Sequence, residues 1–145
     1  MNIKNNVKVE KLDDFGRGIG YVDNKIIFIS DAMIGEVVDV NIIKETNKYY
    51  EGEVIKYIKK SRDRVNVSCP YYKFCGGCNI LHMNYDNQIN YKKDKLKNIL
   101  KKFSGLNLDI DVIKNKDVIC YRNKIELKIQ DNRWVYYNSN THNLL

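Results

Sequence analysis

The chain has 145 residues, which suits one domain or two small ones. Its residues are 43% hydrophobic and 30% charged, a composition typical of globular rather than disordered proteins. No apolar run approaches the roughly 18 residues of a membrane span, and the first residues lack the apolar stretch of a secretory signal. We therefore expect a cytoplasmic protein with no membrane partner, whose four cysteines are metal ligands or reactive thiols rather than disulfides.

The net charge of +7 is unevenly distributed along the chain. Residues 1–65 carry 12 basic and 11 acidic side chains, a net charge of +1. Residues 66–145 carry 13 basic and 7 acidic side chains, a net charge of +6. A basic excess in one half indicates a polyanionic partner such as RNA or DNA, although a lysine-rich coding bias explains it equally well.

Five short apolar segments, separated by turn signals, occupy the first 64 residues. They are Val7–Val9, Ile19–Tyr21, Ile26–Ile29, Val38–Ile42 and Tyr49–Tyr57. The second and third are joined by Asp23-Asn24, a pair typical of a tight hairpin turn. So short a β segment can bury a core and leave no long edge only as a closed barrel or a tight sandwich. We predict that residues 1–64 form a five-stranded β-barrel, with a second domain over residues 65–145.

One helix is predicted over residues 85–103, with Asn84 as its N-cap and Gly105 as its C-terminal stop. Its apolar stripe consists of Tyr85, Ile89, Leu96, Ile99, Leu100 and Phe103. The opposite face is rich in lysine, which fits either a solvated surface or an RNA contact. Three further strands are predicted, at 110–112, 123–129 and 133–137. The predicted class is therefore mainly β with one long helix.

The most specific local signal is a C-x5-C-x2-C motif formed by Cys69, Cys75 and Cys78. Three thiols can converge on one point only if the backbone turns tightly, and Gly76 and Gly77 permit that turn. Soft thiolate ligands, a turn and backbone N–H donors to sulfur suit an iron–sulfur cluster. Zinc is the alternative, although its structural sites usually combine two short-spaced pairs. Three ordinary buried thiols are the remaining interpretation.

A fourth cysteine, Cys120, lies 42 positions after Cys78, just before Tyr121–Lys124 and the predicted strand 123–129. A lone cysteine at such a position is more often a small buried hydrophobic residue than a ligand. We therefore expect Cys120 to be buried and outside the metal site.

The first part of the chain resembles a TRAM domain, a small RNA-binding β-barrel of OB-like shape. The matching features are Gly16–Gly20, Ile27–Ile29, Ala32–Val38, and Ser61–Val65 leading to Cys69-Pro70. The resemblance implies that residues 1–64 form an RNA-binding barrel.

The second part resembles the iron–sulfur RNA uracil-5-methyltransferases, of the type that modifies 23S rRNA. Cys69–His82 looks like their cluster motif, and Tyr121–Lys124 looks like a motif of their central α+β domain. The resemblance implies a [4Fe–4S] cluster on Cys69, Cys75 and Cys78, which zinc could replace or which could be lost. It also implies that the chain is the N-terminal portion of such an enzyme. In the family the fourth cluster cysteine lies beyond the position of Leu145.

In this family a cysteine attacks uridine C6, and S-adenosylmethionine then methylates C5. No Gly-rich cofactor fingerprint and no suitable nucleophile are visible, so we expect no catalytic residue in this chain and S-adenosylmethionine binding only in the full-length enzyme. The target base must leave its stack, so the RNA must be gripped around it. We expect a monomer that binds RNA, most plausibly rRNA, by ring stacking and phosphate contacts. The candidate residues are Phe15, Arg17 and Phe28 on the barrel and Tyr121, Arg122 and Lys124 on the central sheet.

Two alternatives remain for the function. One is a stand-alone TRAM-type RNA-binding or chaperone protein with a metal-binding knuckle. The other is a domain of another iron–sulfur enzyme, such as a methylthiotransferase. Those enzymes usually carry a C-x3-C-x2-C motif and place the TRAM domain last, unlike the order of parts here.

Overall fold

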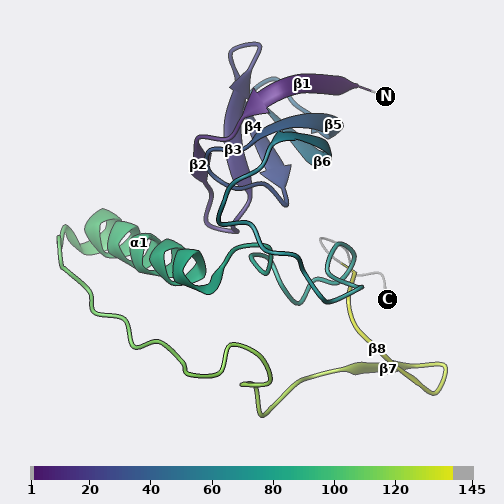
Figure 1. Cartoon of the computed structure of the whole chain (residues 1–145), viewed down its shortest axis with the longest axis vertical. Helices are drawn as coiled ribbons and strands as arrows, with labels where there is room; N and C mark the ends of the chain where they lie inside the picture. The colour runs from purple at the N-terminus through teal and green to yellow at the C-terminus, as the bar shows by residue number, and fades with distance from the viewer. Residues whose placement is uncertain (1, 139–145) are drawn as a thin grey trace. The chain divides into compact units, whose positions relative to one another are not determined.

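The computed structural model describes residues 2–138 of the chain (Figure 1). The chain divides into two compact units, Met1–Asn66 and Val67–Leu145. Among the described residues, no helix is both long and apolar enough to cross a membrane.

The first unit is a single six-stranded sheet, in the order β1-β5-β6-β4-β3-β2. Its strands are β1 (Ile3–Lys8), β2 (Lys11–Leu12), β3 (Gly18–Val22), β4 (Lys25–Ser30), β5 (Val37–Glu45) and β6 (Tyr49–Lys59). Neighbouring strands are antiparallel except β4 and β6, which run parallel. All five predicted strands are present, and β2 is an additional one.

The predicted barrel is not closed, because the strand order begins at β1 and ends at β2. These two edge strands are nevertheless successive pieces of one stretch of chain. Between them, the Val9 N–H bonds to the carbonyl of Glu36, whereas the Glu10 N–H bonds to the carbonyl of Ile19 (2.9 and 2.8 Å). The chain therefore changes partner within two residues, so that β1 lies at one edge of the sheet and β2, a few residues later, at the other (Figure 1).

The tight turn predicted between β3 and β4 is confirmed. Asp23 and Asn24 both have positive φ angles, 51° and 60°, and Val22 pairs with Lys25 across the turn. Two successive residues with positive φ make a type I′ turn, whose twist matches that of the flanking strands. The turn fixes the register that puts Ile27 opposite Gly20.

The core of this unit is formed by one face of the bent sheet together with Ala32 from the loop after β4. Its buried side chains are Val7, Val9, Ile27, Ile29, Ala32, Val38, Val40 and Tyr50. Gly52 on β6 faces this core, and a Cβ atom there would lie 2.4 Å from Val40 Cγ1 and 2.7 Å from the Asn41 carbonyl oxygen. The absence of a side chain at Gly52 thus lets β5 and β6 bend tightly over the core.

The second unit contains the predicted helix, α1 (Tyr85–Ser104). The Asn84 side chain caps it by accepting a hydrogen bond from the Asn87 N–H (2.9 Å). Gly105 ends it with a φ of 70°, its N–H bonding to the Lys101 carbonyl (3.1 Å). Both predicted caps are confirmed. No residue of α1 is buried, so its apolar stripe remains accessible along its length.

Only the end of the predicted C-terminal sheet is present, as the hairpin β7 (Lys128–Gln130) and β8 (Arg133–Val135). The predicted strand at 110–112 and the first five residues of the predicted strand 123–129 are wrong. In Figure 1 the chain from α1 to β7 runs as an extended loop. An apolar run becomes a strand only when a neighbouring strand accepts and donates its backbone hydrogen bonds, and within the described residues these runs have no such neighbour.

Candidate nucleic-acid interface

Phe15 and Arg17 are presented by a tight loop between β2 and β3 that Asp13 organises. One carboxylate oxygen of Asp13 accepts the backbone N–H groups of Phe15 and Arg17 (2.9 and 2.8 Å). The other accepts the Arg17 Nε–H at 2.6 Å. Gly16 supplies the positive φ of 82° that the loop requires. The loop therefore holds the guanidinium in a fixed direction and leaves the Phe15 ring 65% exposed.

Phe28 lies on the outer face of β4 and not in the core. Its strand neighbours Ile27 and Ile29 are fully buried, and side chains alternate between the two faces of a strand. The Arg17 guanidinium carbon lies 4.7 Å from the centre of the Phe28 ring and 5.7 Å from that of Phe15. The three barrel residues predicted to contact RNA are thus brought together into one cation–aromatic cluster.

Three further residues of this cluster were missed by the sequence analysis. Tyr49 on β6 packs edge-to-face against Phe28, with ring centres 5.7 Å apart. Lys44 on β5 lies over the Tyr49 ring, 5.6 Å from its centre. Glu51, the residue that pairs with Phe28 across β4 and β6, faces both cations. The alternation along β6, in which Tyr50 and Gly52 point inward, could have placed Tyr49 and Glu51 on the outer face, but not beside Phe28.

We call these six residues the aromatic face: Phe15, Arg17, Phe28, Lys44, Tyr49 and Glu51. Exposed rings flanked by cations are the usual means by which proteins hold single-stranded nucleic acid, since every base offers a flat face for stacking. Hydrogen bonding to Tyr49, followed by the charge of Glu51, raises the pKa of Lys44 above its ordinary value, so this lysine is charged at neutral pH.

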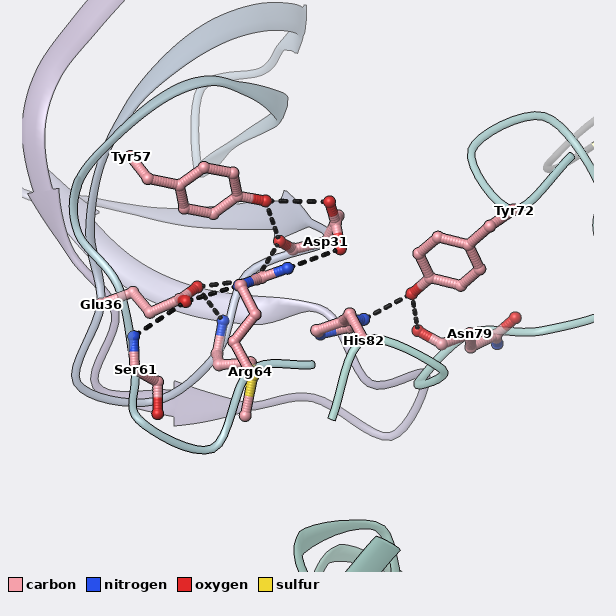
Figure 2. Close-up of polar contacts among 9 residues, drawn as sticks. Asp31, Glu36, Tyr57, Ser61, Arg64, Tyr72, Asn79 and His82 are labelled. Carbon is pink, nitrogen blue, oxygen red and sulfur yellow. Dashed lines mark hydrogen bonds and ion pairs between the residues drawn. The ribbon is translucent and has the colours of Figure 1, made fainter. Parts of the chain in front are cut away.

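A second polar cluster lies at the end of the barrel and is structural (Figure 2). Arg64 forms a two-pronged ion pair with the fully buried Glu36, at 2.7 and 2.8 Å, and a third contact with Asp31 at 3.1 Å. The Tyr57 hydroxyl donates toward Asp31, and the backbone N–H of Ser61 bonds to Glu36. These contacts tie the chain that leaves β6 to the loop between β4 and β5.

The three cysteines of the motif lie near one another in a loop built from successive turns. Burial, and next the charges of Cys75 and Cys69, raise the pKa of the Cys78 thiol. The Gly77 N–H approaches the Cys75 sulfur at 3.3 Å, the kind of donor that thiolate ligands use. The donor set therefore suits a thiophilic metal. Among the described residues, however, no group of three His, Cys, Asp or Glu side chains is arranged around a metal position.

Two contacts fix the cysteine loop from outside. The Tyr72 hydroxyl bonds to Nδ1 of the fully buried His82 and also to the Asn79 carbonyl (Figure 2). The Gly76 N–H bonds to the Tyr137 carbonyl at 3.0 Å, which joins the loop to the segment after β8.

The predicted positions of Cys120 and of the residues after it are wrong. Cys120 is exposed, has a φ of 58° and is not part of a strand, because no neighbouring strand pairs with this segment within the described residues. Tyr121, Arg122 and Lys124 are exposed and lie in the same irregular segment, so they do not share a strand face. The charge of Arg122 lowers the pKa of Cys78, which puts its guanidinium within electrostatic reach of the cysteine loop.

The comparisons with known proteins agree with the six-stranded sheet of the first unit. Residues 4–55 match the TRAM domain family. The chain is 37% identical over 123 residues, 85% of its length, to the "23S rRNA (uracil(1939)-C(5))-methyltransferase RlmD" of Vibrio parahaemolyticus, of which the match covers 28%. It is 42% identical over 103 residues, 71% of its length, to the protein of the same name from Psychromonas ingrahamii, covering 23% of it.

A third relative is the "Uncharacterized RNA methyltransferase" of Clostridium tetani. It is 34% identical over 145 aligned positions, covering 97% of this chain and 32% of the relative. The chain thus spans only 23% to 32% of the length of these proteins. It contains a TRAM domain and is homologous, over the matched stretch, to the 23S rRNA uracil-C5-methyltransferases and other RNA methyltransferases.

Proposed function

We propose that this chain is the RNA-recognition portion of an S-adenosylmethionine-dependent methyltransferase that modifies uridine C5, with rRNA as its substrate. The observation that supports this most directly is the aromatic face, an exposed ring-and-cation surface on the outside of a TRAM domain. The names of the relatives supply the reaction and the substrate class. The described residues supply a surface for holding unstacked RNA and no reacting group.

The aromatic face would act by holding bases on either side of a target nucleotide. Phe15 offers a freely accessible ring, and Arg17 lies over the rings of Phe15 and Phe28, where it can contact the face of a base stacked beside them. Such a grip positions RNA without touching the reacting atoms. We therefore expect the 145-residue chain to bind RNA as a monomer and to transfer no methyl group by itself.

The test is RNA binding by the whole chain, measured by fluorescence anisotropy with a labelled single-stranded RNA. Phe15→Ala should cost about 1–3 kcal/mol of binding, the usual worth of one base stacked on a ring. Phe103→Ala, which removes an even more exposed ring from α1, is the control and should leave the affinity nearly unchanged. Equal losses in the two variants, or no binding by the unmodified chain, would contradict the proposal.

We also propose that Cys69, Cys75 and Cys78 hold an iron–sulfur cluster that acts as a structural staple for the second unit. The C-x5-C-x2-C spacing of the three cysteines in one loop and the Gly77 N–H near the Cys75 sulfur support this assignment. Such a cluster would supply the chain with a rigid cross-link between the three thiols, and a [4Fe–4S] cluster would need one further ligand from elsewhere. Cys120 is the one other cysteine in the chain, and its separate, exposed segment gives no reason to make it that ligand.

Iron and zinc content per chain after anaerobic reconstitution tests this assignment. We expect Cys75→Ser to lose the bound metal and Cys120→Ser to keep it. Zinc without iron would favour a zinc knuckle instead. Loss of metal from both variants would make Cys120 a ligand.

A further inference from the structure

Glu51 is an acidic residue in the middle of a surface that would otherwise be attractive to phosphate. It lies on the outer face of β6, directly across from Phe28, between Gly52 and the buried Tyr50. Its side chain is 27% exposed, so the carboxylate is partly accessible to solvent. A carboxylate at this position repels a backbone phosphate that approaches the face.

The same carboxylate oxygen of Glu51 serves both cations of the face. It lies 3.8 Å from Arg17 Nη1 and 3.9 Å from Lys44 Nζ. Both separations are long, and Arg17 is already held by Asp13 at 2.6 Å. Two cations therefore face two carboxylates, so the face is electrically balanced and attracts phosphate only weakly.

An unpaired base can bind to this electrically balanced face through its ring and its N–H groups. Its ring can stack on Phe15, Phe28 or Tyr49, and its amino or imino N–H groups can donate to a carboxylate. In a duplex the rings are stacked and those N–H groups are engaged in pairing, so chiefly phosphates and sugars remain available.

We propose that Glu51 is a specificity-determining residue, which makes the aromatic face select unpaired bases of single-stranded RNA over the phosphates of a duplex. This inference rests on the proposed function, because it assigns a preference to the same RNA-binding face. Loss of the Glu51 charge should therefore strengthen binding to duplex RNA rather than weaken binding to single-stranded RNA.

The experiment compares Glu51→Gln with Glu53→Gln in the full chain. Both variants lose one negative charge from the same strand, and Glu53 lies two residues further along the same face, outside the aromatic face. Anisotropy titrations use one single-stranded RNA of about 12 nucleotides and a duplex of the same sequence, at several salt concentrations. Circular dichroism confirms that both variants are folded.

In Glu51→Gln, affinity for the duplex should rise about fivefold and the salt slope should steepen by about 0.9, as one phosphate contact is gained. Affinity for the single strand should stay the same or fall, so the preference for single-stranded RNA is reduced. Glu53→Gln should change the affinity for the single strand and the affinity for the duplex only slightly and to the same extent. If the two variants behave alike while the unmodified chain binds single strands, the inference is overturned and the proposed function stands. If the unmodified chain binds no single-stranded RNA, both are overturned.

Discussion

Glu36 is the central residue of the polar cluster that holds the end of β6 to the loop between β4 and β5. Its carboxylate is fully buried, which by itself raises its pKa. Hydrogen bonds from Arg64 and from the backbone N–H groups of Met33 and Ser61 outweigh that effect, and the pKa of Glu36 is lower than its ordinary value. The ionised form is therefore the stable one in the folded chain, and it balances the charge of the largely buried Arg64 side chain.

We expect Glu36→Gln to lower the free energy of unfolding by roughly 3 kcal/mol at pH 7, because it leaves Arg64 without its main counter-charge. Asp31 still contacts Arg64, which keeps the loss at the lower end of the usual range. Urea denaturation followed by circular dichroism measures the change. Glu53→Gln, on the exposed face of β6, is the control and should stay within about 0.5 kcal/mol of the unmodified chain.

The pH dependence of this loss gives a second readout of the same prediction. Because the pKa of Glu36 is lowered by folding, its contribution is fully present above the unfolded value of about 4.3 and is lost as the pH falls through the folded value. The stability difference between the unmodified chain and Glu36→Gln should therefore shrink as the pH falls below about 4. A difference that is independent of pH would show that packing, not charge, is responsible.

At the scale of the elements, the strands of the barrel could be predicted because each is specified locally. The alternation of Ile27, Phe28 and Ile29 and the turn at Asp23-Asn24 need no distant partner to be interpreted. The site was only partly predictable. Phe15, Arg17 and Phe28 are close in sequence, whereas Tyr49 and Glu51 reach them through the parallel pairing of β4 with β6, which no local pattern reveals.

The second unit shows the opposite case. Its helix was predicted because Asn84 and Gly105 cap it without outside help. The strands around Ile110 and Asn123 were predicted from apolar composition alone, and a strand is stable only beside another strand. Within the described residues these segments have no such partner, so they stay irregular and Cys120 stays exposed.

Gly52 is the position on β6 where an added side chain would collide with β5. We expect Gly52→Ala to destabilise the chain by about 1–3 kcal/mol, because the new Cβ would meet backbone and the Val40 methyl inside their contact distances. Thermal unfolding measures the effect. Glu53→Ala, the next residue on β6, controls for strand propensity and should have a smaller effect. A neutral or stabilising Gly52→Ala would mean that β5 can shift outward at no cost.

At the scale of the whole molecule, the net charge is distributed unevenly between the two units. The aromatic face belongs to the first unit, whose net charge is +1 over residues 1–65. The second unit carries the net +6 over residues 66–145, much of it as lysine on α1. Since phosphate contacts dominate the affinity for nucleic acid and stacking contributes base selection, we expect the second unit to supply most of the salt-dependent binding.

Two triple variants with equal charge loss test this division. The first replaces exposed lysines of the second unit by glutamine, at Lys92, Lys101 and Lys116. The second does the same on the barrel, at Lys8, Lys56 and Lys59. The slope of log affinity against log salt for a single-stranded RNA should flatten by about 0.7 for every phosphate contact removed.

We expect the salt slope to flatten more in the second-unit variant. The second unit is strongly positive, so its lysines should make more of the phosphate contacts that are lost. The barrel variant removes charges from a nearly neutral unit, and it leaves all six residues of the aromatic face in place. It should therefore retain the preference for single-stranded over duplex RNA. Equal flattening of the salt slope in both variants would show that the lysines of the two units make the same number of phosphate contacts. A larger effect in the barrel variant would place the phosphate contacts beside the aromatic face and would contradict the division of roles.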